Sequence, residues 1–312
     1  MSLMSQIRFH RKLFLICIVM LAYGQGKNSQ AVAQDFQSMR VAEDTLAAIL
    51  TRLNQAEDDS LRYILNDSFR TTLSSIMMLP GADDAKFESL KTLIKITSDD
   101  NRFRIVHWNL PTQDGRKKYF GFLKLLHQSP PVLFPLTDFS DSIASPDTVI
   151  LDCSHWFGAL YYKVITEKNA RGKEYYTLLG WAGNNAAITQ KVIEILSFDD
   201  KGIPQFGLPV FPNYARGNNT RVVFRYSAST TMSLKYEEQP ITSEKKWNPE
   251  KRGFNEKSRN ALMIVFDRLV PLDPQLERLY QFYVAAGDIF DGFQFTHGSW
   301  NFIQGIEPKN KH

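Results

Sequence analysis

Hydrophobic and polar positions alternate in two different ways along this chain. Between residues 35 and 96, apolar residues recur at steps of three and four with charged residues between them, the period of an amphipathic helix. A Pro80-Gly81 break follows the second stripe. The pattern therefore predicts three helices, whose stripes are Met39, Ala42, Leu46, Ile49 and Leu53; Leu61, Leu65, Phe69, Leu73 and Ile76; and Phe87, Leu90, Leu93 and Ile94.

After residue 100 the apolar residues come in short runs separated by turn-forming residues, which predicts β-strands. Asp114-Gly115 lies between the first two runs and is a strong hairpin signal. About a dozen short strands with close turns favour an antiparallel meander over alternating strand–helix units. The predicted strands are 102–108, 118–126, 148–153, 158–166, 175–181, 191–198, 221–226, 232–236, 262–267, 280–284, 293–296 and 300–303.

These patterns predict an α+β fold with two parts. A helical segment over residues 34–98 precedes a mainly antiparallel β domain over residues 99–312, built as a sandwich, a barrel or a propeller-like meander. The stretch 237–259 is a polar insertion, rich in charges and interrupted by two prolines. We expect a solvated hairpin tip there, with a docking loop anchored by Trp247 as the alternative.

The N-terminus has the pattern of a secretory signal peptide over residues 1–33. A basic head precedes the apolar run Leu13–Tyr23, and a small-residue cleavage site, Ala31-Val32-Ala33, follows. Gly24 offers a second cleavage position. The apolar run is shorter than the roughly 20 residues of a membrane-spanning helix. We therefore expect an exported protein, periplasmic or extracellular, with no transmembrane anchor after cleavage.

Removing that leader changes the charge of the chain. The formal net charge of the whole chain is +4, and residues 1–33 hold four basic residues and no acidic one. The remainder has 33 basic and 33 acidic residues. A neutral chain lacks the basic surface that nucleic acids require, so nucleic acid is not an expected partner. Cys153 remains without a partner cysteine and is expected to be a buried apolar residue.

The common signatures of catalysis and cofactor binding are missing from the sequence. It contains no H-E-x-x-H, no close cysteine pair, no G-x-S-x-G and no glycine-rich turn opening a helix. We therefore expect no cofactor and no metal site. Asp152 interrupts the apolar run 149–153, so it is either a structural carboxylate with a partner or a group at an opening.

The stretch Y-Y-T-L-L-G-W-A-G-N-N, residues 175–185, is the strongest candidate for a binding site. In a strand, Tyr175 and Trp181 lie on one face, and Gly180 lets a neighbouring group approach closely. One interpretation is core aromatics followed by a turn. The other places Tyr175 and Trp181 on a sugar or peptide. The candidate ligand-binding residues are Tyr175, Trp181, Asn184, Asn185 and Asp152.

Several motifs in order along the chain resemble those of a family of secreted proteins from Bacteroidetes-type bacteria. They include Phe103–Asn109, Tyr119-Phe120-Gly121, Gly158–Lys163, the 175–185 stretch and Gly298-Ser299-Trp300. The resemblance implies export and no particular activity. The chain departs from it at Ala182, where an acidic residue is commoner. The resemblance also implies O-glycosylation at Asp-Ser/Thr-aliphatic triplets, which here would modify Thr45, Ser60, Ser142 and Thr148.

Two functions remain open at this point. The first is an exported, non-enzymatic envelope or surface protein that binds a protein partner or a glycan. The alternative is a secreted hydrolase with carboxylates such as Asp152 and Asp267 at a loop rim. The sequence gives no indication of the oligomeric state.

Overall fold

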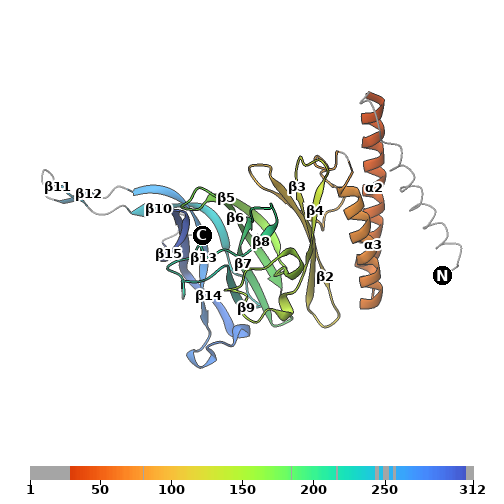
Figure 1. Ribbon diagram of the computed structural model, residues 1–312. Coiled ribbons are helices and arrows are strands. Elements are labelled where there is room, and N and C mark those ends of the chain that lie inside the picture. Colours follow the sequence, from red (N-terminus) through yellow and green to blue (C-terminus); the bar gives the residue numbers. More distant parts are fainter. Residues whose placement is uncertain are drawn as a thin grey trace.

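Two helices and three β-sheets lie one behind another in the computed structural model (Figure 1). The structure describes residues 29–306 except 80, 184, 216, 243–245, 249–252 and 256–257. The helices are α2 (Ser29–Gln55) and α3 (Asp59–Met77), which pack against each other. Among the described residues, no helix is long and apolar enough to cross a membrane.

The first two predicted helices are confirmed. The carboxylate of Asp58 accepts a hydrogen bond from the backbone N–H of Leu61 at 2.8 Å, which satisfies a free donor in the first turn of α3. The apolar stripes of both helices face the neighbouring sheet and are buried there; their buried members include Leu46, Ile49, Leu65, Phe69, Leu73 and Ile76. The predicted leader lies mostly outside the described residues, and Ala33 lies within α2.

The third predicted helix is wrong. Residues 81–93 form turns, and residues 94–97 are already a strand. Phe87 is buried with φ at +48°, a left-handed conformation that interrupts a helix. Lys95 donates to the carbonyls of residues 86 and 87, and Arg104 donates to the carbonyl of residue 85. Side chains of the sheet thus bind carbonyls that a helix would use itself, and the helical segment ends at residue 77 rather than 98.

The first sheet has the order β1-β2-β3-β4, with every pair antiparallel. The predicted hairpin at Asp114-Gly115 joins β2 to β3 and is confirmed. The fourth strand was not among those predicted; it contains Pro135 and lies at the sheet edge, where proline is tolerated. The strands are β1 (Ile94–Thr97), β2 (Phe103–Pro111), β3 (Lys117–Leu125) and β4 (Val132–Thr137).

The other two sheets are also antiparallel. The middle sheet has the order β5-β6-β7-β8, with β9 also paired to β7. Its strands are β5 (Leu160–Lys168), β6 (Glu174–Gly183), β7 (Ile188–Phe198), β8 (Pro204–Phe206) and β9 (Val222–Ser227). The third sheet contains β10 (Leu234–Thr242), β13 (Ser258–Pro271), β14 (Tyr283–Thr296) and β15 (Ser299–Ile306).

Two strand predictions need correction. Residues 148–153 form no strand: Leu151 makes a single bridge to Phe206, and the short helix η2 (Cys153–His155) follows. The Asp152 carboxylate caps that helix and so turns the backbone away from a ladder. In the stretch 280–284, the first three residues form another short helix, η4 (Tyr280–Phe282), and only then does β14 begin.

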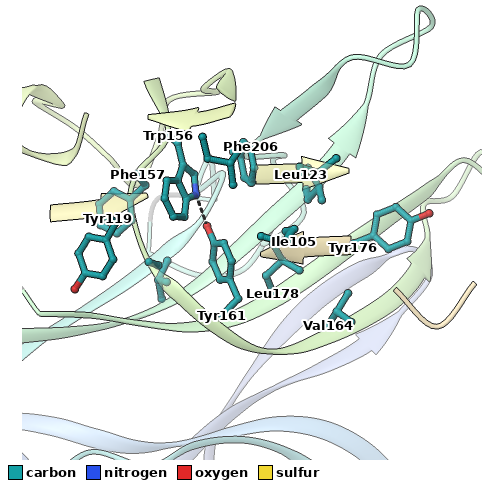
Figure 2. Close-up of a cluster of buried hydrophobic side chains, with 14 of the residues drawn as sticks. Ile105, Tyr119, Leu123, Trp156, Phe157, Tyr161, Val164, Tyr176, Leu178 and Phe206 are labelled. Atoms are coloured by element: carbon teal, nitrogen blue, oxygen red, sulfur yellow. Dashed lines mark hydrogen bonds between the residues drawn. The ribbon is translucent and has the colours of Figure 1, made fainter. Parts of the chain in front are cut away.

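Large hydrophobic clusters fill the three boundaries between the four layers. One lies between the helices and the first sheet, one between the first and middle sheets (Figure 2), and one between the middle and third sheets. The middle sheet is therefore buried on both faces, and every residue from Tyr175 to Gly180 is buried. The fold is an α+β sandwich with an additional sheet.

The polar insertion forms the expected hairpin. β11 (Lys246–Asn248) pairs with β12 (Gly253–Asn255) beyond the ends of β10 and β13. Figure 1 shows this pair projecting away from the three sheets. The docking role considered for Trp247 stays a prediction.

Candidate functional site

An open groove of about 410 Å³ lies at one end of β6, and we call it the rim groove. Its lining residues come from β3, β6, β7 and β9, from the turn between β6 and β7, and from the connection between β9 and β10. Its lining residues are Lys117, Trp181, Gly183, Asn185, Thr189, Lys191, Tyr226, Ala228, Thr230, Thr231 and Met232. Two sequence candidates, Trp181 and Asn185, therefore lie in the same groove.

Hydrogen bonds from the first sheet and from the turn itself hold the end of β6 in place. The hydroxyl of Tyr119, on β3, accepts from the N–H of Gly183 at 2.6 Å and donates to the carbonyl of the same residue at 3.3 Å. The Asn185 side-chain oxygen accepts from the N–H groups of Ala187 and Ile188, each at 2.9 Å. Asn185 thus builds the turn and faces the groove at once. Asn184 lies outside the described residues.

Trp181 is partly buried and forms an aromatic wall of the rim groove. Its indole ring lies over Gly183, where an added Cβ would come within 2.9 Å of the ring. Lys117 places its ammonium nitrogen 5.2 Å from the ring centroid, within range of a cation–π interaction. The glycine therefore gives the indole its position, and the lysine adds a positive charge beside it.

A second lysine lies opposite Trp181. Lys191 on β7 is the direct cross-strand partner of Trp181, and its ammonium nitrogen is 5.5 Å from the ring centroid of Tyr162. Tyr162 lies at an irregularity in the pairing of β5 with β6, and its hydroxyl donates to the carbonyl of Leu234 at 2.8 Å. Burial lowers the pKa of Lys191, although the negative charge of Asp267 opposes this.

The rest of the groove offers hydroxyl groups. Thr230, Thr231 and Tyr226 line it, and burial raises the pKa of Tyr226; Thr189 also lines it, but its hydroxyl oxygen is buried. No aspartate or glutamate is among the described residues that line it. The groove therefore combines an indole, two ammonium groups and several hydrogen-bonding hydroxyls. Such a site can bind a ligand and orient it, but it holds no carboxylate to act as a general acid or base.

Tyr175 is not part of this site. It lies at the other end of β6, six residues from Trp181 or about 20 Å along a strand. Its side chain is 1% exposed, packs between the middle and third sheets, and donates a hydrogen bond to the carbonyl of Gly298 at 3.3 Å. The interpretation of Tyr175 as a core aromatic fits this position, and the structure does not bring Tyr175 together with Trp181 in the rim groove.

Asp152 and Asp267 do not converge on the rim groove either. One oxygen of Asp152 accepts from the N–H groups of Ser154 and His155 and lies 2.9 Å from Nδ1 of His155. Burial acts to raise the pKa of Asp152, but these hydrogen bonds lower it overall. Asp267 accepts from the N–H of Ser233 at 2.7 Å. Each carboxylate thus has a structural partner, and neither lines the groove.

Sequence reasoning missed a buried ion pair and a buried histidine in the middle of the stack. Glu194 and Arg221 form an ion pair at 2.8 Å with both side chains fully buried. Burial raises the pKa of Glu194, and the guanidinium of Arg221 opposes this. Arg221 also donates to the carbonyls of Val149 and Phe206, so the pair fixes the 146–149 loop to the middle sheet. The sequence does contain one signal of this pair, because Glu194 is a single charged residue inside the apolar run 192–196.

His107 is the other buried group. Its Nε2 accepts from the backbone N–H of Tyr161 at 2.6 Å, so the ring proton is on Nδ1, which donates to the carbonyl of Ile94 at 3.1 Å. Burial lowers the pKa of His107 to about 4. Figure 2 shows the neighbouring hydrogen bond from Trp156 to the hydroxyl of Tyr161, at 2.8 Å. These contacts join the first sheet to the middle one and leave His107 no free nitrogen for chemistry.

The remaining candidates are surface features. Among the described residues, no three histidine, cysteine, aspartate or glutamate side chains are placed to hold a metal ion. Of the four threonines and serines in the glycosylation triplets, Ser60, Ser142 and Thr148 are exposed. Thr45 is partly buried and donates to the carbonyl of Val41 within α2. Cys153 is partly buried, and burial raises the pKa of its thiol to about 12.

No family model matches the chain, and no curated protein or solved structure is significantly similar to it. The resemblance to secreted proteins of Bacteroidetes-type bacteria therefore stays a prediction. The function is therefore inferred from the shape and the lining residues of the rim groove.

Proposed function

We propose that this protein is an exported, non-enzymatic binding protein of the cell envelope or surface whose rim groove binds a carbohydrate. The observation that carries the proposal is the partly buried indole of Trp181 in a groove that also presents threonine hydroxyls and the Asn185 amide. A sugar ring has an apolar face that packs on an indole and hydroxyls that exchange hydrogen bonds with such groups. The predicted leader supports export.

The size of the groove favours a saccharide over a folded protein partner. Its volume of about 410 Å³ lies in the range of roughly 300–1,000 Å³ that is typical of small-ligand sites. A stable protein interface buries about 800 Å² on each partner, which needs a broad surface rather than a groove. The absence of a carboxylate among the described lining residues favours binding over hydrolysis.

Tryptophan fluorescence offers a direct test. Trp108, Trp156 and Trp300 are buried in the layers, so among the described tryptophans Trp181 is the one that a groove ligand can reach. We would titrate the purified protein, in a Trp247→Phe background, with a panel of neutral and acidic oligosaccharides. We expect a saturable change for at least one class, and a loss of at least about tenfold in affinity in Trp181→Ala, or about 1.4 kcal/mol.

Phe282→Ala is a matched control, because it also removes an aromatic side chain, 37% exposed in this case, from a position outside the groove. It should bind like the parent protein. The proposal fails when no saccharide in the panel binds, or when Trp181→Ala binds the active saccharide as tightly as Phe282→Ala does.

A further inference from the structure

The two lysines of the rim groove have no carboxylate partner among the described residues. Neither Lys117 nor Lys191 takes part in an ion pair there, and each is held over an aromatic ring instead. By contrast, the neighbouring Arg116 pairs with Asp114 at 2.6 Å, and Lys118 pairs with Asp141. The hairpin therefore neutralises its other cations and leaves Lys117 free.

Strand geometry explains this selection. Side chains alternate between the two faces of a strand, so Lys117 and Tyr119 of β3 point to the groove side while Lys118 points to the other. The same alternation on β7 places Lys191 opposite Trp181, beside Thr189 in the groove lining. Lys117 from the first sheet and Lys191 from the middle sheet therefore both line the groove beside Trp181.

A partly buried ammonium group without a counter-ion is unfavourable, and an anion that enters the groove relieves that cost. Among the described lining residues, no acidic side chain competes for the lysines. The nearest acidic influence on Lys191 is that of Asp267, whose carboxylate accepts from the N–H of Ser233 and forms no ion pair with the lysine. The groove is thus electrostatically suited to an anionic group next to a sugar ring.

We infer that the ligand of the rim groove is an acidic saccharide, whose carboxylate or sulfate group is bound by Lys117 and Lys191 while its ring packs on Trp181. This inference rests on the proposed function and narrows the expected ligand to one class of saccharide. The acidic group provides charge-assisted hydrogen bonds to both ammonium groups, and the indole provides the apolar contact. Affinity should fall with rising ionic strength, because the groove is open to solvent.

Matched pairs of saccharides provide the test. Each uronate-containing oligosaccharide would be titrated beside its neutral methyl ester, and each sulfated disaccharide beside the unsulfated form, with the same tryptophan fluorescence readout. We expect the acidic member of one pair to bind at least about tenfold tighter than its neutral counterpart. The pair that shows this preference identifies the acidic group as a carboxylate or a sulfate.

Variants of the lysines complete the test. Lys117→Gln and Lys191→Gln, singly and together, should remove the preference for the acidic member and leave the neutral member within about twofold. Lys118→Gln, one position along β3, removes the same charge from the other face and should preserve the preference. Melting temperatures of all variants would show that the fold is intact, and Lys117→Gln keeps the test valid if Lys191→Gln is unstable.

The outcomes separate the two proposals. Equal binding of acidic and neutral members, lost in Trp181→Ala, leaves a carbohydrate-binding protein and overturns the acidic class. An acid preference that survives the double lysine variant also overturns it. Absence of any saccharide binding overturns the proposed function and this inference together.

Discussion

The two ends of β6 carry similar aromatic residues with different roles. Tyr175 is 1% exposed between the middle and third sheets, whereas Trp181 is partly buried and lines an open groove. Both occupy the same face of the same strand. Tyr175 is covered by residues of the third sheet, including Phe295, while among the described residues no aromatic ring of that sheet packs on Trp181. The extent of the covering layer, rather than the type of residue, decides which aromatic is core and which is surface.

The charges of the neighbouring strand β7 repeat this contrast. Glu194, at the covered part, is fully buried and paired with Arg221 at 2.8 Å. Lys191, three residues away at the groove, has no carboxylate partner among the described residues. A charge inside the stack must bring its own partner, since an unpaired buried charge is strongly destabilising. A charge at the open rim is partly solvated, so it can remain unpaired until a charged ligand binds.

The largest expected effect comes from truncating the covered end. Tyr175→Ala should lower the free energy of unfolding by about 3–5 kcal/mol, because it removes a buried aromatic ring and leaves a cavity. Trp181→Ala, at the open end, should cost no more than about 1 kcal/mol. Chemical denaturation of both variants measures the difference. Similar losses for the two variants would contradict the distinction between core and rim.

A second effect, nearly as large, concerns pH and the link between the first and middle sheets. The pKa of His107 is about 4 in the folded protein, below the ordinary value near 6.5. Between pH 4 and 6.5, this histidine is therefore more fully protonated in the unfolded chain than in the folded protein. The stability that the neutral imidazole contributes is complete above pH 6.5 and is lost as the pH falls to 4. The loss attributable to this group is about 3 kcal/mol.

The measurement is the free energy of unfolding from pH 7 to 4, for the parent protein and for His107→Gln. The difference between the two curves should shrink as the pH falls, since the variant has no imidazole to protonate. His297→Gln is the control, because His297 is exposed and forms no ion pair among the described residues, and it should leave the parent curve unchanged. A constant difference between the parent and His107→Gln would refute the role assigned to His107.

A smaller effect separates the two glycines of the stretch. An added Cβ at Gly180 would come within 2.8 Å of the Tyr161 ring and 3.0 Å of Val192, both fixed in the core. Gly180→Ala should therefore cost about 1–3 kcal/mol by overpacking. At Gly183 the added Cβ meets the Trp181 ring and the Lys117 side chain, which lie at the rim. Gly183→Ala should cost less than Gly180→Ala.

Thermal unfolding of the two alanine variants checks this ranking, and ligand titration adds a second readout. Gly183→Ala should shift the fluorescence of Trp181 and weaken ligand binding, whereas Gly180→Ala should alter stability first. A larger stability loss for Gly183→Ala would mean that the rim is as closely packed as the core.

Local patterns determined much of the architecture in advance. The helical stripes of α2 and α3, the Asp114-Gly115 hairpin and most strands follow from periodicity and turn chemistry, which depend on neighbours in sequence. Gly180 was expected to permit a close approach, and the Tyr161 ring takes that place. Trp181 and Asn185 were both candidates, and both line the rim groove.

Only the tertiary structure decided the rest, because the deciding partners lie far away in sequence. Phe87 is left-handed, and side chains of the following strands, Lys95 and Arg104, bind its carbonyl and that of Ala85. Tyr175 is core because a sheet about 100 residues later covers it. Lys117 and Lys191 share a groove because two sheets stack at that edge. The sequence by itself predicted most of the strands and the alternation of side chains within them, and the stacking of the layers determined which faces remain open to a ligand.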